Sequence, residues 1–150
     1  MRTYLLMLVF VSATAIFGQG KIFTSEEALK EFGEVIISVE IDVEMVTVYL
    51  QDKDTKSLLF SMYDKEASIT KGGGTILLGK LKKDQIRYKY SAEILNEFFG
   101  KIKSNKVRLE TRSKINPKTK TNYFSIGEVV EAGKGGLVLE MAGNCPPFCD

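Results

Sequence analysis

The chain has 150 residues, of which 44% are hydrophobic and 27% are charged, and its formal net charge is +2. This length suits one domain with a sizeable core, and the balance of apolar and charged residues argues against a disordered chain. The sequence contains no histidine, which excludes Ser-His and Cys-His nucleophilic catalysis, histidine general bases and imidazole metal sites.

The first 20 residues have the pattern of a secretory signal peptide. Arg2 precedes an apolar run over residues 4–17, which is too short for the roughly 20 residues of a membrane-spanning helix. Ala13-Thr14-Ala15 fits the small-x-small cleavage pattern, and Gly18 to Gly20 offer a second candidate site. We therefore predict a signal peptide over residues 1–20, a mature chain of residues 21–150 without a transmembrane segment, and a secreted or periplasmic location.

The mature chain begins with a helix signal followed by a strand signal. Thr24 and Glu27 have the spacing of a capping box, and Gly33 provides a helix end. Apolar residues then alternate with mostly polar ones from Val35 to Met45, which predicts a strand with one dry face and one largely wet face. The apolar phase slips after Met45, which indicates a bulge or a tight turn.

The rest of the chain alternates short strand patterns with turns. The expected strands cover residues 58–63, 75–79, 85–90, 106–113 and 137–141, and the first of them reads as a returning strand. A second helix is expected over residues 91–100, with Ser91 as its N-cap and Gly100 near its end. Residues 123–132 fit a short helix or a strand equally well.

These elements predict an α+β fold, a mostly antiparallel β-sheet with two helices packed on one face. There is no internal repeat and no linker long enough to divide the chain. We predict a single α+β domain over residues 21–150 that ends in a C-terminal cysteine loop.

Two cofactor-like motifs are incomplete. Residues 74–80 match G-x-x-x-x-G-K, but Leu81 stands where a phosphate loop needs Ser or Thr. Asp52 and Asp54 start like a calcium-binding loop, but the sharp-turn Gly and the terminal Glu are missing. The sequence therefore predicts no cofactor and no metal, and residues 51–57 read as a turn.

Three carboxylates follow one another on the wet face of the first strand. Glu40, Asp42 and Glu44 are expected about 7 Å apart from the rise of a strand. This spacing is compatible with a glycosidase pair or a calcium site. A solvated sheet face explains it better, because a half-buried antiparallel strand carries its charge outward.

The stretch over residues 80–120 is basic and interleaved with tyrosines. Such a pattern can hold an anionic polymer through charge and stacking. For an exported chain the matching partner is an acidic polysaccharide, a lipid surface or a protein, and nucleic acid is not expected. Lysines that protect strand edges explain the same pattern, and we favour that explanation. The candidate partner-binding residues of this stretch are Arg87, Tyr88, Lys89, Tyr90, Arg108 and Arg112.

Both cysteines lie in the last six residues, in the sequence Cys145-Pro-Pro-Phe-Cys149. No helix N-terminus or cation follows to favour a thiolate, and the two prolines prevent a helix that would place Met141 beside both sulfurs for copper. We therefore predict a local disulfide between Cys145 and Cys149, which export permits, with Phe148 as a candidate partner contact on its loop.

Together these features favour an exported, non-catalytic binding module, either an inhibitor or a surface or periplasmic recognition domain. A small secreted enzyme with a carboxylate-based site and a structural or assembly subunit are the alternatives. A cleft that converges on perturbed carboxylates would favour the enzyme. A protruding aromatic loop would favour the binding module, and a long uncharged strand edge would favour the assembly subunit.

Overall fold

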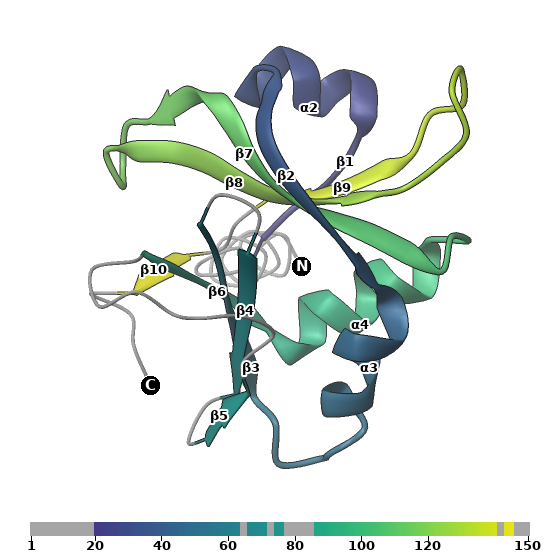
Figure 1. Cartoon of the computed structure of the whole chain (residues 1–150), viewed down its shortest axis with the longest axis vertical. Helices are drawn as coiled ribbons and strands as arrows, with labels where there is room; N and C mark the ends of the chain where they lie inside the picture. Colours follow the sequence, from purple (N-terminus) through teal and green to yellow (C-terminus); the bar gives the residue numbers. More distant parts are fainter. Residues whose placement is uncertain (1–19, 64–65, 72–73, 77–85, 141–142, 146–150) are drawn as a thin grey trace, which may run out of the picture.

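The computed structural model describes residues 20–63, 66–71, 74–76, 86–140 and 143–145. These residues form two five-stranded antiparallel sheets and three helices, so the α+β class is confirmed (Figure 1). We name the sheets A and B.

Sheet A has the strand order β1-β9-β8-β7-β2. Its strands are β1 (Ile22–Thr24), β2 (Val35–Asp42), β7 (Lys106–Asn116), β8 (Thr121–Glu128) and β9 (Leu137–Glu140). Strands β8 and β9 form the hairpin expected near the C-terminus, with Ile126 opposite Leu139. The ambiguous segment over residues 123–132 is thus part of a strand as far as Glu128.

Sheet B has the strand order β10-β6-β3-β4-β5. Its strands are β3 (Ser57–Tyr63), β4 (Glu66–Lys71), β5 (Gly74–Ile76), β6 (Arg87–Ser91) and β10 (Gly143–Cys145). Strand β3 pairs with β4 and β6 and not with β2, so it starts a new sheet where a returning strand was expected. Strand β4 was not predicted, because Ser68 and Thr70 alternate with Ala67 and Ile69 on a strand buried on both faces.

Helix α2 (Ser25–Phe32) confirms the capping box. Thr24 Oγ1 accepts a hydrogen bond from Glu27 N at 3.2 Å, and Thr24 N donates to Glu27 Oε1 at 3.0 Å. Gly33 follows the last helical residue, as expected. The helix buries Ala28 and Phe32 in a small cluster with Val138 on the outer face of sheet A.

Helix α4 (Ala92–Lys101) also starts at its predicted cap. Ser91 Oγ accepts a hydrogen bond from Ile94 N at 3.2 Å. The helix runs through Gly100 and ends one residue beyond it, at Lys101. Ile94, Leu95 and Phe98 form the buried face.

Helix α3 (Val43–Leu50) corrects the prediction for its segment, where the strand was expected to reach Met45 and then to meet a bulge or a tight turn. Val43, Val46 and Leu50 recur at helical spacing and pack on the main core, and Val46 is fully buried. Packing of this face against the core outweighs the modest helix propensity of β-branched residues.

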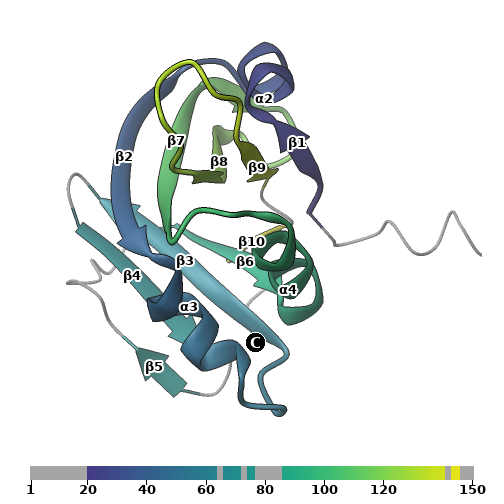
Figure 2. The same ribbon diagram turned by 90° about the vertical axis from the view of Figure 1, so that its right-hand side faces the viewer.

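The main core lies between the two sheets, and α3 and α4 contribute to it. Tyr88 of sheet B stacks on Phe124 of sheet A with ring centroids 4.3 Å apart. Helix α2 lies on the opposite side of sheet A, as the two views show (Figures 1 and 2). The helices therefore do not all pack on one sheet face, as was predicted. α3 and α4 pack on the core between the two sheets, and α2 packs on the other face of sheet A.

Candidate functional site: the free edge of strand β2

Strand β2 is the last strand of sheet A on one side. It pairs with β7 from Val35 opposite Arg112 to Asp42 opposite Lys106. No other strand among the described residues pairs with it, and Figure 2 shows it at the margin of the sheet. An edge strand presents unpaired N–H and C=O groups to its surroundings. Strand β2 therefore offers a free backbone edge.

Apolar side chains are concentrated on this strand and on the helix that follows it. Val35, Ile36 and Ile37 are 39%, 55% and 42% exposed. Eight large hydrophobic side chains are exposed among the described residues, and five of them lie between Val35 and Val48. Residues 35–39, Val-Ile-Ile-Ser-Val, carry no charge, and we call this segment the β2 edge.

The exposure of Val35 and Ile37 corrects the dry face predicted for this strand. Ile41 is buried and Val39 packs against the main core, whereas Val35 and Ile37 are exposed. The reason is the edge position. In the described part of the chain, β2 has a neighbouring strand on one side alone, so its side chains are exposed where the main core ends. Ile36 on the predicted wet face was the one signal in the sequence that this segment departs from simple alternation.

Acidic residues flank the β2 edge at both ends. Glu34 precedes it, and Glu40 and Asp42 follow it on the same strand. Glu40 lies 3.4 Å from Lys106 Nζ and opposite Arg108 in the register.

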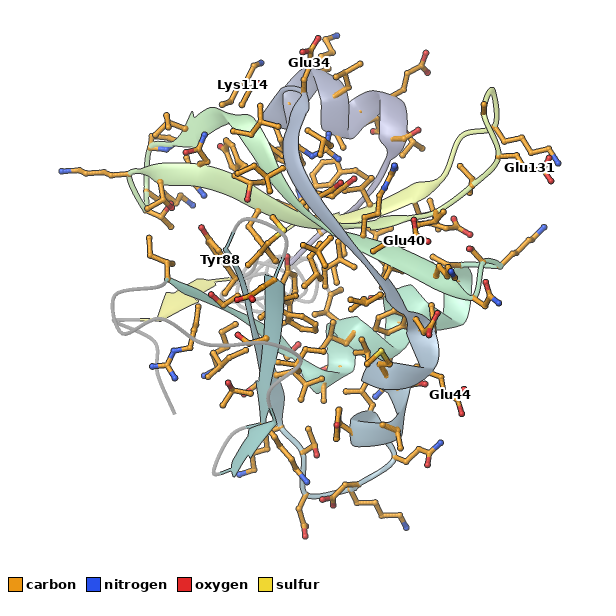
Figure 3. All side chains as sticks on the ribbon, in the orientation of Figure 1. Glu34, Glu40, Glu44, Tyr88, Lys114 and Glu131 are labelled. Carbon is orange, nitrogen blue, oxygen red and sulfur yellow. The ribbon has the colours of Figure 1, made fainter. Side chains whose placement is uncertain are left out.

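Glu44 lies on α3 and not on the strand, so the single carboxylate face predicted for Glu40, Asp42 and Glu44 is wrong. In Figure 3 the labelled Glu34, Glu40 and Glu44 are spread along β2 and α3 and do not point toward one another. The described residues contain no group of three His, Cys, Asp or Glu side chains placed to hold a metal ion.

A buried ion pair lies beside β2 on the outer face of sheet A. Glu110 and Arg112 of β7 are 1% and 4% exposed. Arg112 Nη2 donates to Glu110 Oε1 at 2.9 Å, and Arg112 Nε donates to Ser125 Oγ at 3.1 Å. Ser125 Oγ in turn donates to Glu110 Oε1 at 3.0 Å. The two charges therefore neutralise each other inside the fold.

The same cluster holds the start of β2. Arg112 Nη1 donates to the Gly33 carbonyl at 3.1 Å. Ser113 N donates to the Glu34 carbonyl at 2.8 Å, and Glu34 N donates to Ser113 Oγ at 3.0 Å. These bonds fix the passage from α2 into the β2 edge.

Glu110 has no free oxygen for chemistry. Gly127 makes room for its carboxylate, because a Cβ at that position would lie 2.6 Å from Oε1. Arg108 Nε is 3.6 Å from Oε2, and the Glu110 side chain is 2% exposed. The arrangement suits a structural anchor and not a general base.

The carboxyl group with a raised pKa among the described residues is that of Glu140. Burial raises this pKa, and the charges of Lys118 and Lys21 partly oppose the effect. The other shifted carboxyl groups, Glu27 and Asp52, have pKa values that hydrogen bonds lower. No pair of carboxyl groups with opposing shifts is brought together in the described part of the chain, so it offers no matched acid and base.

The predicted basic patch divides between the two sheets. Arg87, Tyr88 and Lys89 lie on β6 of sheet B, while Arg108 and Arg112 lie on β7 of sheet A. Arg87 and Lys89 are half-buried, and Arg108 is partly exposed.

Burial corrects the expectation for two of the predicted partner-binding residues. Tyr90 is fully buried in the main core, and Arg112 is enclosed by Glu110 and Ser125. Tyr88 is half-buried with one ring face against Phe124, and burial raises the pKa values of both tyrosines. Tyr90 is buried because it packs among apolar residues of the core, and Arg112 is buried because it bonds Glu110 and Ser125. Neither side chain is therefore available to a partner on the surface.

The C-terminal motif is only partly described. The backbone of Cys145 ends β10 and lies opposite Arg87. Cys149 and Phe148 lie outside the described residues, as do residues 1–19 of the predicted signal peptide (residues 1–20) and the residues Gly79, Lys80 and Leu81. The disulfide and the Phe148 contact therefore stay predictions.

Comparisons with protein-family models, with curated proteins and with solved structures found no match for this chain. Among the described residues, no helix has both the length and the apolar character needed to cross a membrane.

Proposed function

We propose that this protein is an exported, non-catalytic binding module that takes up an extended segment of a partner along the β2 edge. The observation that carries the proposal is the exposed, uncharged apolar row on a free edge strand. Proteins usually blunt such edges with lysine, proline, a β-bulge or a cover. Residues 35–39 contain neither lysine nor proline, and their register with β7 shifts once, between Val35 and Ile37. In strand addition, backbone hydrogen bonds supply affinity and the alternating side chains supply specificity.

The same uncharged edge favours an assembly subunit as the second candidate, since subunits can pair through free strands. An enzyme has less support, because Glu44 lies on α3 and does not point toward Glu40 of β2 (Figure 3). An anionic polysaccharide or a lipid surface is the weaker class of partner, because the basic residues are divided between two sheets.

Site-specific photo-crosslinking in the native host tests the proposal. A photoreactive residue at position 36 is expected to form a discrete covalent adduct with a partner in the envelope or medium. The matched control is position 115, where an isoleucine of nearly equal exposure, 56%, lies on β7. Mass spectrometry of the adducts should identify a partner peptide at position 36 alone. Equal adducts at both positions, or none at position 36, would contradict the proposal.

Export is the second part of the proposal, and it predicts where the mature chain starts. The Lys21 carbonyl accepts a hydrogen bond from Glu140 N at 2.9 Å, and Gly20 is buried against the Glu140 backbone. Cleavage after Lys21 would remove the hydrogen bond between the Lys21 carbonyl and Glu140 N, whereas cleavage after Gly20 keeps it. Mass spectrometry of the native protein is expected to show a first residue between Ile16 and Lys21. An intact Met1 on protein recovered outside the cytoplasm would overturn this expectation.

A further inference from the structure

We propose that the segment bound at the β2 edge is a strand of another protein that carries basic residues at both ends of an uncharged, β-branched centre, and is not a second copy of this chain. The inference rests on the proposed function and adds the chemical class of the partner. It follows from the charges at the ends of the β2 edge.

The end that leads into α3 carries an excess of negative charge. Glu40, Asp42 and Glu44 lie there, and only Glu40 has a cationic neighbour within ion-pair distance, Lys106 at 3.4 Å. Asp42 and Glu44 form no ion pair with any described residue. Lys106 lies opposite Asp42 in the register, but its ion pair is with Glu40. A cation placed beside this end by a bound strand therefore meets two carboxylates that form no ion pair with the described residues.

The opposite end is also acidic. Glu34 stands immediately before the β2 edge, and its carboxylate forms no ion pair with the described residues. Lys114 is a basic side chain at the same end of the molecule (Figure 3), and its Nζ donates to the Lys30 carbonyl at 2.7 Å. The two ends of the edge thus favour the same sign of charge on a bound strand.

A second copy of β2 meets like charges. An antiparallel pair that covers all of residues 35–39 sets Val35 opposite Val39, and this register places Glu34 opposite Glu40 at both ends. A parallel pair in register sets each glutamate beside its own copy. Like charges directly opposite each other destabilise paired strands. A strand of another protein with Lys or Arg at these positions gains attraction where a second copy meets repulsion.

The centre of the bound strand faces uncharged side chains. Ile36 and Ile37 are both about half exposed, and the register of β2 with β7 shifts between Val35 and Ile37. A bound strand places its side chains next to those of the β2 edge, so β-branched residues in its centre remove part of this apolar surface from water. Charged residues in the centre would lose hydration against Ile36 and Ile37 without gaining a partner.

Two synthetic peptides test the inference on the unmodified mature protein. Both have the centre Val-Thr-Val-Thr-Val; one has two lysines at each end and the other has two glutamates. Fluorescence anisotropy is expected to show the lysine peptide binding at least about tenfold more tightly at low salt, with a smaller ratio at high salt. Hydrogen exchange is expected to slow at the amides of residues 35–39 when the lysine peptide binds.

A pair of variants tests whether the lysine peptide binds at the β2 edge. Ile36→Lys adds a like charge to the edge and is expected to weaken binding of the lysine peptide by at least about tenfold. Ile115→Lys makes the same change at a site of equal exposure and is expected to leave binding unchanged.

The outcomes separate this inference from the proposed function. Equal binding of both peptides, with protection of residues 35–39, overturns the charge class and leaves strand addition standing. No protection by either peptide overturns both. A dimer in sedimentation that Ile36→Lys abolishes and Ile115→Lys preserves would identify a second copy as the occupant and overturn the inference.

Discussion

Replacing Glu110 with Gln is expected to lower the free energy of unfolding by about 3–5 kcal/mol, the cost of leaving one partner of a buried ion pair uncompensated. The guanidinium of Arg112 would stay enclosed by Ser125 and the Gly33 carbonyl but would lose the carboxylate that neutralises it. Urea denaturation followed by circular dichroism measures the change.

Two variants control this result. Glu40→Gln removes a carboxylate 3.4 Å from Lys106 at a half-exposed site and is expected to cost less than about 1 kcal/mol. The double variant Glu110→Leu with Arg112→Met removes both buried charges and is expected to recover much of the loss, because apolar pairs of similar volume often replace buried ion pairs. A loss for Glu110→Gln no larger than that for Glu40→Gln would contradict the anchoring role of the cluster.

The second large effect is expected for Gly33→Ala, with a loss of about 3 kcal/mol or more. Gly33 has φ 84° and ψ −173°, a conformation that is essentially restricted to glycine. A Cβ there would also overlap Ser113 Oγ and lie 3.1 Å from the backbone nitrogen of Lys114. Ser113 Oγ accepts the Glu34 N–H, so its displacement would release the start of the β2 edge.

Gly133→Ala is the matched control for this change. Gly133 has a similar positive φ of 89°, but a Cβ at that position meets nothing within 4 Å. Its cost is therefore the backbone strain alone, about 1–2 kcal/mol. Thermal or urea unfolding of both variants separates strain from steric overlap, and equal losses would show that the contact with Ser113 is unimportant.

Local signals in the sequence were sufficient for α2 and α4. Each helix starts at a predicted cap, where Thr24 or Ser91 bonds a backbone N–H three residues later. Such bonds join residues close in sequence, so their residue types and spacing are enough to indicate them. The strand over residues 35–42 was recognised for the same reason, since alternation is a local property.

Strand β4 and helix α3 were missed because distant residues stabilise them. β4 pairs with β3 and β5 and is buried on both faces, so Ser68 and Thr70 are as enclosed as Ala67 and Ile69. In α3, Val46 is buried in the core that α4 and the two sheets share. Neither environment is visible in a short window of sequence.

The sequence by itself determined the spacing of the charges on β7 and the uncharged run on β2. Arg108, Glu110 and Arg112 share one strand face by the period of two, and residues 35–39 are free of charge in any fold. Only the tertiary structure decided that Glu110 and Arg112 are enclosed and that β2 is an edge. The physical reason is that burial and strand order depend on which distant elements pack together. The end of α2 at Gly33 lies against Arg112 and helps to enclose it, and β3 pairs with β6 in the second sheet and not with β2.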